Sequence, residues 1–116
     1  MNLKIHFGNK ELEVNDVKKV SEFGKFSGLM FRTNNTSNLL FEFSMSSNPI
    51  FHSWFVFFPF LIVWLDEKNN VQEVKLVNPF TTMIQSKEHC KKLIEIPLNK
   101  KNSSLVHLLV GKERFK

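Results

Sequence analysis

Residues 50–65 read IFHSWFVFFPFLIVWL and form the longest apolar stretch of the chain. The stretch is shorter than the roughly 20 apolar residues that a membrane helix needs, and it contains His52, Ser53 and Pro59. Apolar residues on both faces are typical of a buried strand, and a proline nitrogen cannot donate to a strand ladder. Residues 51–66 are therefore predicted as one central strand or as two strands bent at Pro59, with no membrane span.

Shorter apolar runs that end at turn residues flank this core and predict further strands. They are residues 39–43, residues 71–77 after a turn at 67–70, residues 93–96 before Pro97, and a final short strand after Gly111. A short helix is predicted over residues 104–108. Ser21 can cap another short helix with Phe23, Phe26 and Met30 at its apolar positions, which Gly28 would end in a left-handed conformation.

The N-terminal residues 3–14 show apolar and polar residues in strict alternation around Gly8-Asn9. Gly-Asn suits a two-residue turn that needs positive φ, so this segment predicts a β-hairpin. The register pairs Ile5 with Leu12 and Leu3 with Val14 on one face, and Lys4 with Glu13 and His6 with Glu11 on the other.

The composition favours a single β-rich domain over residues 1–116. There are thirteen phenylalanines and no alanine, and Phe, Val and Ile suit a half-buried pleated surface. An AT-rich genome would produce the same bias without any structural cause. The short predicted strands indicate a mainly β fold, a compact jelly-roll-like sandwich or partly closed barrel with one or two short helices.

Cys90 is the only cysteine, which excludes an intramolecular disulfide and fits a reducing compartment. The alternating N-terminus does not resemble a secretory signal, so we expect a cytoplasmic protein. Lys91, next to Cys90, could lower the pKa of the thiol, although a lone cysteine before a strand is more often a small apolar residue.

The net charge of +5 comes from the C-terminal third. From Lys87 onward, eight basic residues stand against three acids, Glu88, Glu95 and Glu113. Such a region could bind nucleic acid, but the aromatic residues are not interleaved with Lys or Arg as a stacking surface requires. We expect the lysines to point in several directions.

Solvation explains least well the positions of Arg32, Glu42 and His52. The simplest interpretation is that Arg32 and Glu42 pair, because a buried charge is costly without a partner. The functional alternative is a pocket in which Arg32, His52 and Glu42 are walled by Trp54 and Phe80 and Arg32 holds an anion. A third alternative is catalysis by Glu42 and His52.

Sequence motifs for metals and cofactors are missing. The histidines lie far apart, Glu88, His89 and Cys90 are adjacent and cannot all face one ion, and the glycine spacings match no phosphate-binding or dinucleotide motif. We expect no metal, no cofactor and no established enzymatic chemistry.

The order of several motifs resembles domain-of-unknown-function family 192, in the spacing of its archaeal-type branch. The motifs are GLMFR at 28–32, LLFEF at 39–43, His52 before an aromatic run that ends in FP at 58–59, LD at 65–66, PF at 79–80 and IEIP at 94–97. The resemblance covers roughly residues 21–111 and implies a small all-β fold like a jelly roll or partly closed barrel, with no established activity.

Two departures from that family count against chemistry in this chain. Leu61 stands where many members have an acid, and residues 53–56 read SWFV where bacterial members have a polar stretch. The first hypothesis is therefore a noncatalytic module that binds a small ligand or protein, with an anion pocket near Arg32. The alternatives are a nucleic-acid-binding domain and an unrecognised enzyme.

Overall fold

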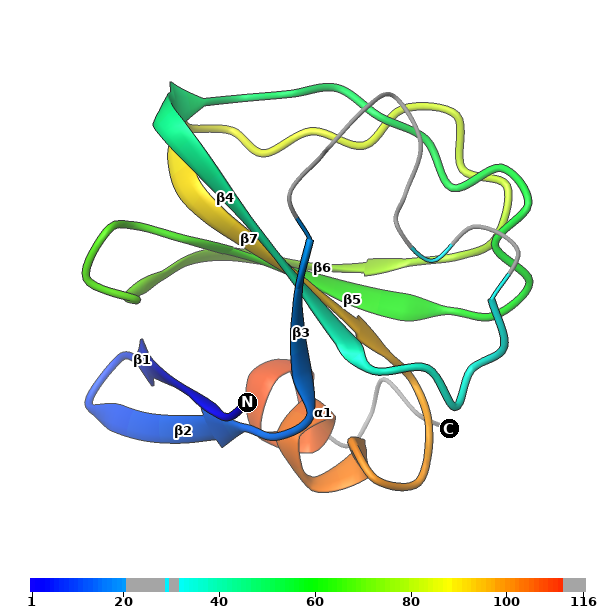
Figure 1. The fold of residues 1–116 in the computed structure, drawn as a ribbon, viewed down its shortest axis with the longest axis horizontal. Helices are drawn as coiled ribbons and strands as arrows, with labels where there is room; N and C mark the ends of the chain where they lie inside the picture. Colours follow the sequence, from blue (N-terminus) through cyan, green and yellow to red (C-terminus); the bar gives the residue numbers. More distant parts are fainter. Residues whose placement is uncertain (21–28, 30–31, 112–116) are drawn as a thin grey trace.

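The computed structural model describes residues 1–20, 29 and 32–111. In these residues a two-stranded hairpin is followed by a five-stranded sheet with the order β3-β4-β7-β5-β6 (Figure 1). The elements are β1 (Leu3–Phe7), β2 (Lys10–Val14), β3 (Val17–Val20), β4 (Asn38–Ser47), β5 (Phe60–Leu65), β6 (Val71–Val77), β7 (Cys90–Pro97) and α1 (Ser103–Val110). The mainly β prediction is confirmed, and the sheets do not close into a barrel.

The N-terminal hairpin has the predicted register. Ile5 pairs with Leu12 and His6 with Glu11, and Gly8 has φ of +63°. Asn9 does not share this positive φ, so glycine occupies the one turn position that L side chains disfavour, as in a type II′ turn. Strand alternation and turn chemistry were sufficient to fix this element.

The central strand begins only after Pro59. All six residues of β5 are fully buried, and the strand pairs antiparallel with β6 on one side and β7 on the other. Residues 51–58 are not a strand, and their described ladder contact is an isolated bridge between Phe51 and Ile84. The prediction of strand structure before Pro59 is therefore wrong, because apolar composition alone does not distinguish a strand from a buried loop.

Two other elements differ from the sequence prediction. β3 was not predicted, and it pairs in parallel with β4 from Val17–Asn38 to Val20–Phe41. The predicted helix at 104–108 is confirmed as the slightly longer α1. The helix expected from Ser21 to Gly28 and the final strand after Gly111 fall outside the described residues. In the described part of the chain, α1 is too short to cross a membrane.

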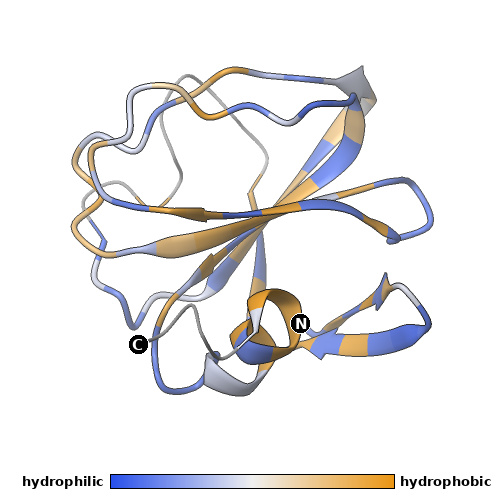
Figure 2. Cartoon of the chain, turned by 180° about the vertical axis from the view of Figure 1, so that it is seen from behind, coloured by the Kyte–Doolittle hydropathy of each residue, from blue (hydrophilic) through white to orange (hydrophobic). Residues whose placement is uncertain are grey.

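Both faces of the five-stranded sheet are apolar, and each is covered differently (Figure 2). The first core lies between the sheet, the hairpin and α1, and includes Ile5, Leu61, Ile94 and Val106. The second core lies on the other face and unites sheet residues such as Trp64 with residues of the long connections. Within the described part of the chain, residues of loops thus complete the second core.

A buried pair of asparagines joins β4 to the start of α1. The Asn102 Nδ2 donates to Asn38 Oδ1 at 3.0 Å and to Pro97 O at 2.8 Å, and Asn38 Nδ2 donates to Asn15 O at 2.7 Å. Asn38 is fully buried and Asn102 nearly so. Because buried amides are costly without partners, this network fixes how α1 meets the sheet.

Replacing either asparagine should leave the amide of the other buried and partly unpaired. We expect Asn38→Leu and Asn102→Leu each to lower the free energy of unfolding by about 1–3 kcal/mol in urea denaturation. The double variant should lose less than the sum of the two. Ser104→Ala, at an exposed position of α1, is the control. Strictly additive losses would show that the two amides do not depend on each other.

Candidate functional site

Two connections lie side by side at one end of the sheet. Residues 51–58 lead from β4 to β5, and residues 78–84 lead from β6 to β7 (Figure 1). Phe51 N donates to Ile84 O at 3.1 Å, and Ile84 N donates to Phe51 O at 2.8 Å. Phe51 and Ile84 are both buried, whereas Ile50 and Met83 next to them are exposed.

Ser53 joins these two connections through both its backbone and its side chain. Its Oγ donates to Asn78 O at 2.9 Å and accepts from Thr81 N at 2.7 Å. Its amide donates to Thr81 O at 2.9 Å, and its carbonyl accepts from Phe80 N at 3.0 Å. Ser53 is fully buried, so one small polar residue satisfies backbone groups that loops would otherwise leave without partners.

The side chains around Ser53 present an exposed cluster of rings, which we call the aromatic platform: Trp54, Phe55, Phe57 and Phe80. Their exposed fractions are 45%, 42%, 60% and 52%. Phe80 lies at the centre, with its ring centroid 6.2 Å from that of Phe55 and 5.7 Å from that of Phe57 in edge-on geometry. Such ring pairs favour each other beyond simple area burial.

The backbone at the aromatic platform is strained. Phe55 has φ of +62° and Phe80 has φ of +60°, in the left-handed region that bulky side chains rarely adopt. Each such residue costs roughly 1–2 kcal/mol relative to the right-handed region. Strain of this kind persists only where the surrounding structure holds it, and it gathers at functional sites.

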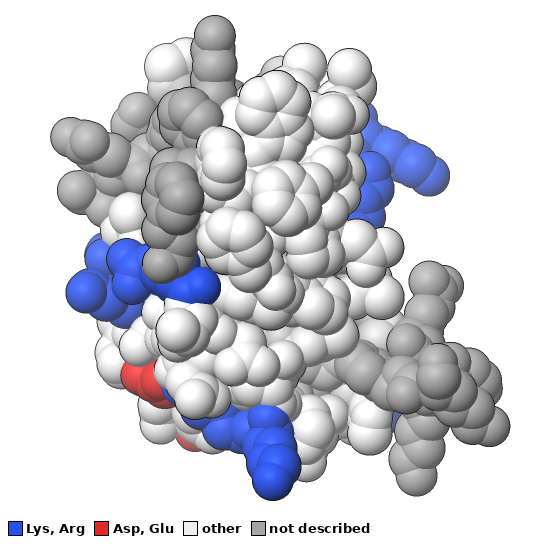
Figure 3. Space-filling model, turned by 90° about the vertical axis from the view of Figure 1, so that its right-hand side faces the viewer, with Lys and Arg blue, Asp and Glu red and all other residues white. Residues whose placement is uncertain are grey.

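The two connections that carry the aromatic platform contain no charged residue. Residues 43–65 and 76–86 contain no Asp, Glu, Lys or Arg, and exposed Ile50 and Met83 flank the Phe51–Ile84 bridge. Among the residues that the structure describes, Figure 3 shows a broad white area at this end of the molecule, with Lys and Arg at its margins and acids near one edge. Exposed apolar surface of this extent marks an interaction site more often than chance.

The structure brings together three of the five predicted site residues. His52 and Trp54 have ring centroids 4.7 Å apart, and His52 Nδ1 accepts from Trp54 N at 3.2 Å. The Phe80 amide donates a hydrogen bond to the carbonyl of Ser53, the residue between His52 and Trp54. His52, Trp54 and Phe80 therefore share one surface.

Glu42 lies on the face of the sheet that carries the first core, opposite to the second core. It is two residues from Leu40 of the first core, and its carboxylate pairs with Lys19 Nζ at 3.4 Å. The predicted ion pair between Arg32 and Glu42 is therefore wrong. Arg32 is exposed, and its guanidinium donates to Thr36 Oγ1 at 3.4 Å.

Two residues with unusual settings were missed. Ser53 was noted as a polar residue of the apolar stretch and as a departure from a family pattern, and Glu95 was counted among the acids of the basic region. Glu95 is fully buried, and its cross-strand neighbours Leu39 and Ile62 belong to the second core. Alternation with Leu93 was the available signal, since residues two apart in a strand share a face.

Two lysines of the C-terminal third contact residues on other parts of the chain. Lys101 forms an ion pair with Asp16, and Lys92 Nζ donates to Asn69 Oδ1 at 2.7 Å. Hydrogen bonds from Lys101 and Ser37 hold the pKa of the Asp16 carboxyl below its usual value. These two lysines are therefore engaged by an acid and an amide of other segments.

Cys90 lacks the properties of a reactive thiol. It is buried, and desolvation raises its pKa to about 11, so the thiol stays protonated near neutral pH. The suggestion that Lys91 lowers this pKa is wrong. In the part of the chain that the structure describes, no group of three His, Cys, Asp or Glu side chains could hold a metal ion.

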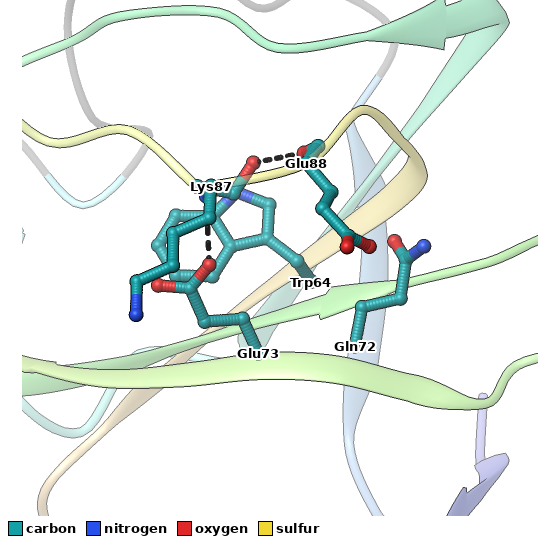
Figure 4. Close-up of a pocket in the computed structure, with 6 residues that line it drawn as sticks. Trp64, Gln72, Glu73, Lys87 and Glu88 are labelled. Atoms are coloured by element: carbon teal, nitrogen blue, oxygen red, sulfur yellow. Dashed lines mark hydrogen bonds between the residues drawn. The ribbon is translucent and has the colours of Figure 1, made fainter.

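A pocket of about 210 Å³ opens at the side of the sheet, lined by Trp64, Gln72, Glu73, Ser86, Lys87 and Glu88 (Figure 4). Its groups are largely occupied with one another. Glu73 Oε1 accepts from Lys87 N at 2.8 Å, and Glu73 Oε2 lies 3.6 Å from Lys75 Nζ. The buried Trp64 Nε1 has no hydrogen-bond partner among the described residues. This polar recess is a weaker candidate than the aromatic platform.

Removing the Ser53 hydroxyl should loosen the aromatic platform. In Ser53→Ala, we expect a loss of about 1–3 kcal/mol in unfolding free energy and faster hydrogen exchange at the Thr81 amide, which loses its acceptor. Thr81→Val, which removes an exposed hydroxyl bonded to Asn78 O, is the control and should leave exchange at Phe80 unchanged. Unaltered exchange at Thr81 in Ser53→Ala would contradict the role of Ser53.

Comparison with known proteins identifies structures with a similar fold and the family of the chain. The structure resembles that of a "putative transcription regulator" from Sinorhizobium meliloti, with a TM-score of 0.66, 13% identity and coverage of 90% of this chain and 84% of that one. It also resembles a protein of unknown function from Novosphingobium aromaticivorans, with a TM-score of 0.63, 12% identity and coverage of 89% and 76%. No curated protein shows a significant match. The family model DUF192, described as uncharacterized ACR, matches residues 4–106, so the chain belongs to this family.

Proposed function

We propose that this chain is a noncatalytic binding module whose binding surface is the aromatic platform. The observation that carries the proposal is the pair of phenylalanines, Phe55 and Phe80, held exposed at positive φ. About half of each ring stays exposed to water, so the burial and ring contacts of these side chains offset only part of the cost of the strained backbone. Recognition offers a reason to keep such an arrangement, because a rigid exposed ring loses little entropy on binding.

The proposal retains His52, Trp54 and Phe80, which the sequence pattern selected, and leaves Glu42 out. Catalysis by Glu42 and His52 is not favoured, because Glu42 lies on the other face of the sheet and pairs with Lys19. Nucleic-acid binding is not favoured either, because Lys92 and Lys101 are engaged by Asn69 and Asp16. The lone buried Cys90 supports a reducing compartment, which we propose to be the cytoplasm.

The binding surface can be tested with bis-ANS, a dye that binds exposed apolar surface. Fluorescence titration of the folded protein should give saturable binding, and the double change Phe57→Ser and Phe80→Ser should weaken it about tenfold or more, equal to ~1.4 kcal/mol. Leu108→Ser, at a 47% exposed position on α1, is the matched control and should leave binding unchanged.

Circular dichroism would confirm that the variants remain folded. Equal dye affinity in the double variant and the wild type would overturn the assignment of the aromatic platform as the binding surface.

A further inference from the structure

The chemistry of the aromatic platform narrows the class of partner. Its exposed side chains are all aromatic, and the exposed side chain of Met83, in the second connection, is long and flexible. These side chains come from the two connections at one end of the sheet. The sequence segments that contain these connections, residues 43–65 and 76–86, have no Asp, Glu, Lys or Arg. Rings that protrude from an uncharged loop surface suit insertion among lipid headgroups and acyl chains, where aromatic side chains are favoured.

Basic residues flank this uncharged area on both sides. On one side, Lys75 Nζ donates to Gln85 O at 2.9 Å, and the exposed Lys87 follows two residues later. The carboxylates of Glu73 and Glu88 lie on that same side, beside these lysines, and offset part of the charge. Figure 3 shows the uncharged face with blue margins on opposite sides.

The other side is supplied by the segments next to β4 and β7. Leu98 N donates to Pro59 O at 3.1 Å, which brings the loop with exposed Lys100 beside the end of residues 51–58. Arg32 N donates to the carbonyl of Leu29, which packs in the second core with Phe51 and Val56. Asn99 Nδ2 donates to Asn34 O at 2.6 Å and so joins these two basic segments.

We propose that the aromatic platform docks on the surface of an anionic lipid bilayer, with its rings in the interface and the basic margin against the headgroups. This inference rests on the proposed function and names its partner. Apolar insertion combined with nearby Lys and Arg is the combination that gives peripheral proteins selectivity for anionic membranes. The strained backbone at Phe55 and Phe80 keeps the rings outward before contact, so binding needs little rearrangement.

The test is flotation of the full chain with two kinds of vesicle, phosphatidylcholine alone and phosphatidylcholine with phosphatidylserine. The wild type should float with the phosphatidylserine vesicles and much less with phosphatidylcholine, and added salt should weaken the binding. Brominated acyl chains should quench Trp54 emission, while Trp64, which is fully buried, serves as the internal reference.

Three variants separate the contributions of the rings, of Met83 and of the basic residues to vesicle binding. Phe57→Ser with Phe80→Ser should lower the vesicle partition coefficient about tenfold or more, and Met83→Glu, at a 68% exposed position, should release the protein without altering the ring cluster. Lys87→Gln with Lys100→Gln should weaken binding to phosphatidylserine vesicles only. Leu108→Ser should bind as the wild type does.

Absence of flotation with either vesicle would overturn the lipid inference. If bis-ANS binding still depended on Phe57 and Phe80, the proposed function would stand and the partner would be a protein or a small ligand instead of a bilayer. Flotation that was indifferent both to phosphatidylserine and to the Phe57 and Phe80 changes would also refute lipid docking by this surface.

Discussion

The fold depends on one constraint, which is that β5 is apolar on both faces. With all six of its residues buried, the sheet that contains it must be covered on both sides. The hairpin and α1 cover one face with regular structure. Irregular loops cover the other, and the hydrogen bonds of Ser53 satisfy backbone groups that regular structure would have paired. The exposed rings of the aromatic platform are a consequence of this second cover.

Elements with local signals could be predicted, and elements defined by distant contacts could not. The hairpin followed from alternation and the Gly8 turn, and β6 from a run bounded by turn residues. β3 has only four residues and exists through parallel pairing with β4, which no local pattern encodes. Residues 51–58 were misjudged because strict periodicity is lost where every residue is apolar, so burial in a loop and burial in a strand look alike.

The candidate site was predictable only in part, because residue types are visible in the sequence and the distant contacts that group them are not. His52, Trp54 and Phe80 stood out as chemistry-bearing residues near turns, and two connections bring them together at one end of the sheet. Glu42 was grouped with them without regard to strand alternation, which places it with Leu40 on the other face. Glu95 shows the reverse error, because a charged residue between Ile94 and Ile96 was assigned to the surface, yet its side chain faces the second core. In both cases the face of the strand mattered more than the residue type.

The protein contains two tryptophans. Trp54 belongs to the exposed aromatic platform, and Trp64 is buried in the second core. Fluorine NMR of the chain labelled with 5-fluorotryptophan should resolve two signals, with Trp54→Phe providing the assignment. We expect the Trp54 signal to show a solvent isotope shift and broadening by a soluble paramagnetic agent, because its side chain is 45% exposed. The Trp64 signal should show neither effect. Equal protection of both signals would contradict the claim that the loops over the second core hold aromatic rings out to solvent.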